Sequence, residues 1–484
     1  MRWFAGLSVV ASLFALSGAA VAQRNASAAQ ALSGLEGEYY VAGEPRTAHT
    51  LAQRMRAYRV PGASIAVIDD YRVVWTYAAG MRDVAADAPV TTTTLFQAAS
   101  MSKPVAAAAI LRLFEAKHLS LDADVNALLR SWHVSMPAGS RQFVTMRRLL
   151  SHSAGVNVHG FVGYDRDAPL PTVVQILNGA PPANSPPIRV TAVPGSKTEY
   201  SGGGTTIAQQ VAADVSGEPF APFMQQTLLG PLGMTRSTFD QPLPEALWAL
   251  AADGYYGDGK PVHRGWHVYP TMAAAGLWTT PADLAKFVIA IQNAMRGHDH
   301  PPIDATVARE MTTRASQGFG LGPEVAAGYF SHNGANEGSQ GIFIGLDTGG
   351  RGVVVLTNSE NGLALAYEVV HSVAKAYHWP VLQPEPRKAI RLTPAMMRDV
   401  AGTYAAKIDG EGVTLDVTIG PSAGAPALSL RTSLESVDRR LYAQAPLRFF
   451  TLSGGSLEFS RGAGGRVTSV EALGAKFDRR ANPR

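Results

Sequence analysis

The chain has 484 residues, a formal net charge of +4 and no cysteine. Hydrophobic residues make up 46% of it and charged residues 17%, which is typical of a globular protein long enough for more than one domain. The small net charge and the lack of a long lysine or arginine run give no indication of a nucleic-acid partner. The absence of cysteine excludes disulfides, thiolate metal sites and a cysteine nucleophile.

The N-terminus has the pattern of a secretory signal peptide over residues 1–22. A positive start at Arg2 precedes an apolar run over residues 3–16, and small residues follow up to Ala22. We predict cleavage after Ala22 and a periplasmic or secreted protein of bacterial type. An uncleaved anchor is the weaker alternative because the apolar run is short for a membrane span. No later stretch is long and apolar enough to span a membrane, so none is expected in the mature protein.

Residues 23–47 are small and polar, and we expect a flexible leader there. The region 48–379 then begins with a helix at 51–58 and a hairpin of two strands, 62–68 and 72–77. Strands at both ends of a long helical middle predict an α+β fold, in which an antiparallel sheet is flanked by helices. Further helices are expected at 105–113, 119–129, 146–150, 173–177, 205–215, from Pro281 onward and at 363–377, and further strands at 341–346 and 352–357.

A second domain is expected after a proline-rich linker at 380–387. In residues 388–484 apolar and polar residues alternate, as at Val413, Leu415 and Val417, and glycine pairs separate the alternating runs. This pattern predicts a small all-β domain, either a sheet or a barrel. It contains no nucleophile with a base, so its expected role is support or substrate gating.

The segment 96–104 holds a hydroxyl and an amine three residues apart. Positions i and i+3 share one face of a helix, so the Ser100 oxygen and the Lys103 amine can meet. Pro104 fits only the first turn, so the helix begins near Ser100, whose backbone N–H is free to hold an oxyanion. The small, apolar alanines that follow exclude water from the Lys103 amine. This desolvation lowers the pKa of Lys103 and lets it act as a base on the serine.

A second Ser-x-x-Lys pattern occurs at Ser372 and Lys375. It lies inside an amphipathic helix with no cap near the serine, so we interpret it as a surface pair on a packing helix. Glu368 and His371 on the same segment are interpreted as a solvated face. A zinc peptidase is disfavoured because no His-Glu-x-x-His occurs, and the sequence predicts no metal and no cofactor.

Two further segments offer partners for Ser100. Tyr200 borders a glycine run, and a tyrosine near a lysine ammonium can become a phenolate that passes protons between serine and leaving group. A polar turn expected at a strand edge over residues 331–336 offers the His332 side chain and the backbone N–H of Ala335, a second oxyanion donor beside the amide of Ser100. Taken alone, Tyr200 fits core packing and His332 fits an exposed turn.

These three segments together resemble the serine β-lactamase and penicillin-binding superfamily, whose pattern is Ser-x-x-Lys, a middle polar triad and a Lys-Thr-Gly strand. The chain is most similar to the class C-like group, which includes family VIII esterases and D-aminopeptidases. Segments 149–155, 231–235 and 276–284 also match that group, and the resemblance covers roughly residues 50–375. The all-β tail resembles the lipocalin-like domains appended to several of these hydrolases.

The resemblance implies a β-lactamase-like fold and a role for each matching residue. The implied catalytic residues are the nucleophile Ser100, its base Lys103, the acylation and deacylation partner Tyr200, and His332 in place of the lysine of Lys-Thr-Gly. Gly202, Asn333, Gly334 and Asn336 are then expected at the substrate. His152 falls in a segment that is structural in this group.

Two departures from the family pattern bear on activity. Gly202 stands where the middle triad carries an asparagine, so the amide that would hold Lys103 and a substrate carbonyl is missing. His332 is mostly neutral at pH 7 and is a poor fixed cation for a β-lactam carboxylate. The sequence therefore favours a secreted serine hydrolase of small esters or D-amino-acid peptides over an efficient β-lactamase.

Two alternatives remain open. One is a class C-like β-lactamase. The other is a non-catalytic module that binds penicillin, cell-wall peptide or a partner protein, for which Gly202 is the favourable feature. An α/β-hydrolase is disfavoured because the chain has no Gly-x-Ser-x-Gly elbow.

Overall fold

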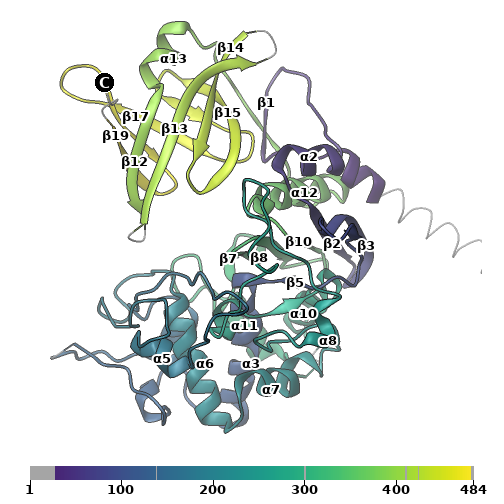
Figure 1. The fold of residues 1–484 in the computed structure, drawn as a ribbon, viewed down its shortest axis with the longest axis vertical. Helices are drawn as coiled ribbons and strands as arrows, with labels where there is room; N and C mark the ends of the chain where they lie inside the picture. The colour runs from purple at the N-terminus through teal and green to yellow at the C-terminus, as the bar shows by residue number, and fades with distance from the viewer. Residues whose placement is uncertain (1–27, 138, 299–300, 409–410, 423–424, 481–484) are drawn as a thin grey trace, which may run out of the picture.

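The computed structural model describes residues 28–137, 139–298, 301–408, 411–422 and 425–480. These residues form a mixed α/β domain followed by a separate β-barrel (Figure 1). The predicted signal peptide and its cleavage site lie outside the described residues. Within those ranges, no helix has the length and apolar character needed to cross a membrane.

The α/β domain is built on a seven-stranded sheet in the order β4-β3-β2-β10-β9-β8-β7. Each neighbouring pair is antiparallel, and β2 pairs with β10 from Ala63 opposite Thr357 to Ile68 opposite Gly352. The sheet is thus assembled from the two ends of the domain, as predicted. Its strands are β2 (Gly62–Asp69), β3 (Arg72–Asp83), β4 (Ala88–Pro89), β7 (Glu324–Ala326), β8 (Tyr329–Asn336), β9 (Ser339–Leu346) and β10 (Gly352–Thr357).

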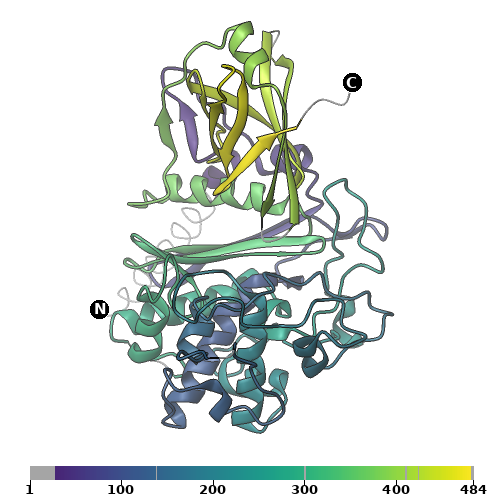
Figure 2. The same ribbon diagram turned by 90° about the vertical axis from the view of Figure 1, so that its left-hand side faces the viewer.

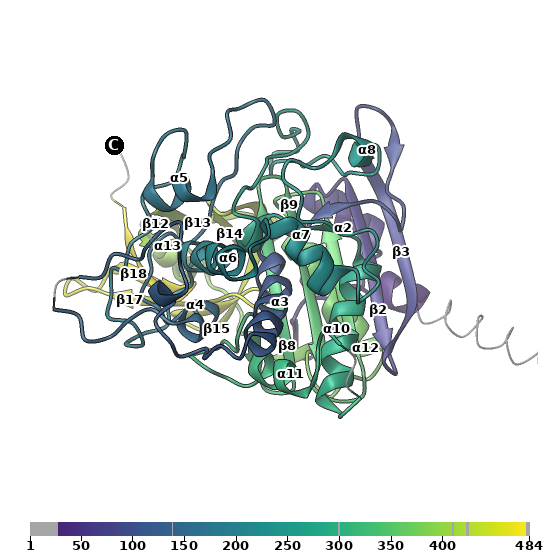
Figure 3. The ribbon, with the colours of Figure 1, turned by 90° about the horizontal axis from the view of Figure 1, so that it is seen from below.

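Helices cover both faces of this sheet (Figures 2 and 3). α3 (Ser102–Ala116), α10 (Pro281–Met295) and α11 (Ala305–Thr312) lie on one face, and α2 (Leu51–Tyr58) and α12 (Gly362–Ala376) lie on the other. Successive residues of a strand point to opposite faces, so β10 contributes Val354 and Leu356 to the α3 side and Val353 and Val355 to the α12 side. The central strands are therefore apolar throughout.

The middle of the chain supplies the rest of the α3 layer. The predicted helix at 119–129 is wrong, because only the turn η2 (Val125–Ala127) is helical there. The Ser120 hydroxyl accepts the Asp122 N–H at 3.2 Å, a local bond that competes with a helix. The other elements are η1 (Ala99–Met101), α4 (Met146–Leu150), α5 (Val173–Asn178), α6 (Gly202–Ser216), α7 (Phe220–Met224), η3 (Gln225–Leu229), α8 (Glu245–Trp248), α9 (Met272–Ala275), β5 (Phe96–Gln97) and β6 (Trp278–Thr279).

The predicted flexible leader is wrong for residues 28–47. β1 (Tyr39–Val41) pairs in parallel with β11 (Glu385–Arg387), which lies in the predicted linker. The Tyr39 N–H also donates to the Leu452 carbonyl of the barrel at 2.9 Å. The N-terminal segment is therefore packed between the two domains, a long-range contact that its small, polar composition did not indicate.

α12 is more deeply buried than its sequence suggested. The Ser372 hydroxyl donates to the Gly34 carbonyl at 2.9 Å, and Lys375 pairs with Glu36, so this Ser-x-x-Lys is not a surface pair. Glu368 and His371 are only 3% and 5% exposed, so the predicted solvated face is wrong as well. The physical reason is that α2 and the N-terminal segment cover the outer side of α12.

The C-terminal domain is a closed barrel of eight strands, β12 to β19, preceded by α13 (Pro394–Val400). β12 pairs with β19 and closes the barrel, which leaves no free edge. Tyr404, Phe449, Phe459 and Phe477 are almost fully buried in its core, so packed side chains fill the barrel. The strands are β12 (Gly402–Ile408), β13 (Glu411–Ser422), β14 (Ala425–Thr432), β15 (Glu435–Ala445), β16 (Arg448–Phe450), β17 (Ser456–Arg461), β18 (Val467–Ala472) and β19 (Ala475–Arg479).

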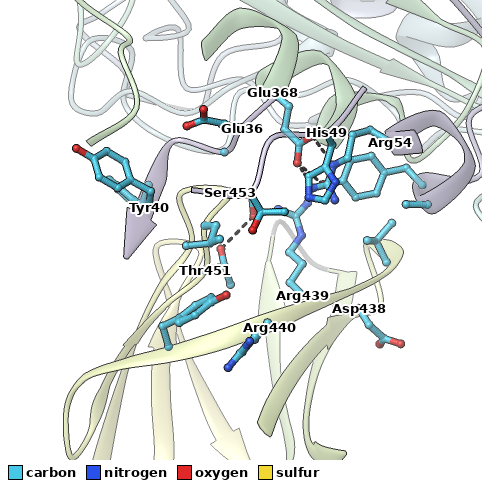
Figure 4. A pocket seen from close by; sticks show the side chains of 18 of the residues that line it. Glu36, Tyr40, His49, Arg54, Glu368, Asp438, Arg439, Arg440, Thr451 and Ser453 are labelled. Atoms are coloured by element: carbon cyan, nitrogen blue, oxygen red, sulfur yellow. Dashed lines mark hydrogen bonds and ion pairs between the residues drawn. The ribbon is translucent and has the colours of Figure 1, made fainter. Parts of the chain in front are cut away.

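A polar cavity of about 460 Å³ lies where the barrel meets α2, β1 and α12 (Figure 4). On the α12 side, Arg54 donates through Nε to Glu368 at 2.6 Å. On the barrel side, Arg439 hydrogen-bonds to Ser453. Charged and polar side chains thus line the junction of the two domains.

Candidate active site

Ser100 lies in a tight turn that leads directly into α3. The turn is η1, and α3 follows at Ser102, so the prediction that the helix begins near Ser100 is confirmed. Ala99, directly before the serine, is buried and has a φ of 50°, in the left-handed region that non-glycine residues seldom adopt. Such strain persists where the surrounding structure imposes it, and it clusters at functional sites. Here it shapes the turn that presents the Ser100 hydroxyl.

Lys103 is poised as a base for Ser100. Its Nζ lies 3.0 Å from the Ser100 Oγ and donates to the Ala274 carbonyl at 2.9 Å. Lys103 is only 4% exposed, and burial lowers its pKa from 10.5 to about 7. A large share of the lysine is therefore neutral near pH 7, with a lone pair that can take the serine proton.

Tyr200 lies on the other side of the lysine, with Nζ 4.8 Å from the centre of its ring. Burial raises the pKa of Tyr200 above its ordinary value of 10, although a hydrogen bond with Ser100 acts in the opposite direction. The phenolate suggested by the sequence is therefore disfavoured, since the low-dielectric surroundings oppose a charge on the ring oxygen. Tyr200 is instead a neutral phenol within hydrogen-bonding reach of the nucleophile.

Two side chains that sequence reasoning did not assign to the site hold Tyr200 in place. The His152 ring lies 4.4 Å from the Tyr200 ring and 4.8 Å from the Phe319 ring. The Ser201 N–H donates to His152 Nδ1 at 3.2 Å, so the Nε2 nitrogen carries the imidazole proton. Burial, with the nearby Lys103 charge, lowers the pKa of His152 and keeps it neutral. His152 thus packs against Tyr200 and accepts a hydrogen bond from the backbone directly after it.

His332 is fully buried on β8, and its ring lies 6.0 Å from the ring of Tyr200. Its Nδ1 is 2.5 Å from the Asn333 carbonyl, which can only accept, so Nδ1 carries the proton. Burial, reinforced by the charge of Lys103, lowers the pKa of His332 to about 3. The imidazole is therefore held in its neutral form, and the polar turn expected over 331–336 is wrong, since these residues belong to strand β8.

Gly334 packs directly against the nucleophile turn. A Cβ at this position would lie 2.3 Å from the Ala98 carbonyl oxygen and 3.0 Å from the Ser100 nitrogen. Only glycine lets β8 approach so closely. The Ala335 amide, which the sequence suggested as the second oxyanion donor, follows Gly334 directly in the chain.

The packing around position 202 explains why a glycine occupies it. Its N–H donates to the His159 carbonyl at 2.9 Å. A Cβ would lie 3.0 Å from that oxygen and 3.2 Å from the Phe161 ring. An asparagine side chain would crowd this corner, and the Ala274 carbonyl supplies the hydrogen-bond acceptor that Lys103 needs.

The two asparagines of β8 differ in their hydrogen bonds within the protein. Asn336 is 7% exposed and donates through Nδ2 to both Gln97 and Ala275, at 3.1 Å each, so its amide hydrogens are used within the protein. Asn333 is half-buried, and its Nδ2 lies 3.5 Å from the Tyr367 hydroxyl on α12. Asn336 therefore anchors the strand, whereas Asn333 is contacted only by Tyr367 among the side-chain hydrogen bonds of the described residues.

Comparison with known proteins agrees with this arrangement. The family model described as Beta-lactamase matches residues 47–377. The chain is 30% identical over 223 residues to Esterase EstB of Burkholderia gladioli, which is 43% of this chain and 53% of EstB. It is 25% identical over 276 residues to the putative penicillin-binding protein PbpX of Bacillus subtilis (strain 168), covering 56% of this chain and 64% of PbpX. The chain thus spans less than two thirds of either relative.

Solved structures share the fold. The octameric penicillin-binding protein homologue from Pyrococcus abyssi superposes with a TM-score of 0.60 at 23% identity, covering 88% of this chain and 97% of that one. The D-amino acid amidase from Ochrobactrum anthropi SV3 gives 0.54 at 21% identity, covering 68% and 96%. The fold of this protein is therefore of the β-lactamase/transpeptidase-like class. Because the family model spans more than half of the chain, the protein belongs to the Beta-lactamase family of serine hydrolases.

Proposed function

We propose that this protein is a secreted serine hydrolase that cleaves esters or amides of small substrates through a Ser100 acyl-enzyme. The observation that carries the proposal is the 3.0 Å contact between Lys103 Nζ and Ser100 Oγ, made by a lysine whose pKa burial lowers to about 7. The secreted location rests on the N-terminal signal pattern alone.

The proposed reaction has two halves. In the first, neutral Lys103 takes the Ser100 proton as Oγ bonds to the substrate carbonyl carbon, and the amides of Ser100 and Ala335 stabilise the oxyanion. Tyr200 donates its proton to the departing alcohol or amine and regains one from the Lys103 ammonium. In the second half, a water molecule loses a proton to neutral Lys103 and attacks the acyl carbon. Cleavage of the ester bond then returns the proton to Ser100 Oγ.

Ester or D-amino-acid amide cleavage is favoured over efficient β-lactam hydrolysis. A neutral His332 provides no fixed positive charge for the carboxylate of a β-lactam. EstB is named an esterase, and the Ochrobactrum protein of the same fold is named a D-amino acid amidase, which supports these substrate classes. A class C-like β-lactamase is the second candidate, favoured by the match to the Beta-lactamase family.

The test is to compare wild type and Ser100→Ala on p-nitrophenyl butyrate, D-alanine p-nitroanilide and a chromogenic cephalosporin. We expect Ser100→Ala to lower turnover of the preferred substrate by about 1,000-fold or more. Ser372→Ala, in the second Ser-x-x-Lys, is the matched control and should retain activity. A fluorophosphonate probe should label wild type but not Ser100→Ala, whereas an unlabelled wild type would indicate a non-catalytic binding module.

A further inference from the structure

The polar cavity between the two domains is separate from the catalytic cleft. Its walls come from the N-terminal segment, α2, α12 and the end of the barrel at which β15 begins (Figure 4). α2 and α12 cover one face of the seven-stranded sheet, whereas α3, which follows Ser100, lies on the other face (Figure 3). A volume of about 460 Å³ can hold a small organic molecule, and domain interfaces and barrel mouths commonly form binding sites.

Arginines outnumber carboxylates in the lining of this cavity. The lining contains six arginines and four carboxylates among the described residues, an excess of two positive charges. Glu36, Glu368 and Asp438 each form an ion pair with an arginine of the lining. Beyond these three pairs, the lining holds three more arginines but only one more carboxylate, Glu44. The cavity is therefore electropositive and suited to a negatively charged ligand.

Two of the guanidinium groups, those of Arg54 and Arg439, approach each other from opposite sides of the cavity. In Figure 4 the Arg439 side chain extends from β15 toward Arg54 on α2. Burial and the charge of Glu368 raise the pKa of Tyr58, and the nearby charges of Arg54 and Arg439 oppose that rise. Like charges in one cavity repel each other, and an anion placed between them is attracted to both.

Arg54 also has a nitrogen to spare for a ligand. Its Nε donates to Glu368 at 2.6 Å, and its Nη2 contacts Glu368 and the Tyr58 hydroxyl. Its Nη1 forms no hydrogen bond within the part of the chain that the structure describes, and the side chain is 23% exposed. Guanidinium groups bind carboxylate and phosphate oxygens with strong, charge-assisted hydrogen bonds.

Neutral donors surround the two arginines. Burial, with the nearby charge of Arg54, lowers the pKa of His49, so its ring is neutral and carries one N–H that can donate. The hydroxyls of Thr451 and Ser453 lie 3.0 Å apart on the barrel side of the lining, where Ser453 also contacts Arg439. A ligand with several acceptor oxygens would find donors on both sides of the junction.

We propose that this cavity is a binding site for a small organic anion with at least two negative charges, carried by carboxylate or phosphate groups. Arg54 on α2 and Arg439 on β15 hold its anionic groups from the two sides, so the ligand links the hydrolase domain to the barrel. Two negative charges match the excess positive charge of the lining. The site has no part in bond cleavage at Ser100, and its existence does not depend on the proposed hydrolase activity.

The test is isothermal titration calorimetry of the full chain with citrate and with pyrophosphate, at an ionic strength held constant with sodium chloride. We expect at least one of the two to bind saturably, one molecule per chain, with a Kd below about 1 mM. Binding of citrate alone identifies a carboxylate ligand, and binding of pyrophosphate alone identifies a phosphate ligand. The absence of saturable binding by both would overturn the proposal.

Variants of the lining place the bound anion. Arg439→Gln should weaken binding by about 10- to 100-fold. Arg440→Glu changes an exposed residue of the lining, so the fold should be retained, and binding should weaken by at least about tenfold. The matched controls are Arg466→Gln and Arg466→Glu, at an exposed barrel residue outside the lining, and both should bind as wild type does. Binding that survives both lining variants, or that the control variants weaken equally, would place the anion elsewhere and overturn the proposal.

Discussion

Replacing Lys103 with methionine should abolish activity and, at the same time, stabilise the protein. The lysine is 4% exposed, and burial lowers its pKa from 10.5 to about 7. Methionine has a similar length and carries no charge. The variant therefore removes the base that activates Ser100. It also removes the unfavourable free energy of burying an ammonium group away from water.

The size of this effect follows from the two pKa values. Their difference corresponds to about 4 to 5 kcal/mol of destabilisation when Lys103 is protonated in the folded and unfolded states alike, which holds below about pH 7. Loss of the hydrogen bond to the Ala274 carbonyl costs about 1 to 3 kcal/mol. At pH 6, Lys103→Met should therefore be more stable than wild type by about 2 kcal/mol.

The sign of the pH dependence provides the sharper measurement. Between about pH 7 and 10.5 the unfolded chain binds a proton that folded Lys103 does not, so wild-type stability rises with pH. The advantage of Lys103→Met should then shrink by about 2 to 3 kcal/mol from pH 6 to pH 9.

Urea denaturation at both pH values measures the free energy of unfolding of the variant and of wild type. Lys117→Met, at the exposed C-terminal end of the same helix, is the control and should show no such change. A Lys103→Met advantage that stays constant with pH, or a variant that is less stable at pH 6, would refute the reasoning.

Three further predictions address the site. Because neutral Lys103 is the base, wild-type kcat/KM should rise with pH through about 7, and a flat profile from pH 6 to 8 would count against this role. Gly334→Ala should lower kcat by about 100-fold, because its Cβ would lie 2.3 Å from the Ala98 oxygen and displace the oxyanion donors. Gly420→Ala, whose Cβ would meet nothing within 4 Å, should leave kcat unchanged, and an equal loss in the two variants would contradict the geometry. His332→Lys should lower KM for carboxylate-bearing esters by about tenfold, and an unchanged KM would indicate that position 332 does not face the substrate.

Features that depend on residues close together in the chain could be predicted from the amino-acid sequence. The Ser100 and Lys103 pair depends on a spacing of three residues at a helix start, and Pro104 fixes that start. Likewise, the helix expected from Pro281 onward is capped locally, because the Thr280 side chain accepts the Asp283 N–H at 3.2 Å. Strand alternation predicted the β-rich C-terminal domain for the same reason, since a two-residue period is visible within a few positions.

Contacts between distant segments could not be read in this way. Nothing near His152 in the chain indicates that its ring packs on Tyr200. The burial of α12 depends on an N-terminal segment more than 300 positions away. The order of residues determines the local hydrogen bonds within a helix or strand. The packing of remote elements decides which side chains are removed from water. For Lys103 this removal lowers the pKa to about 7, at which the amine can act as a base.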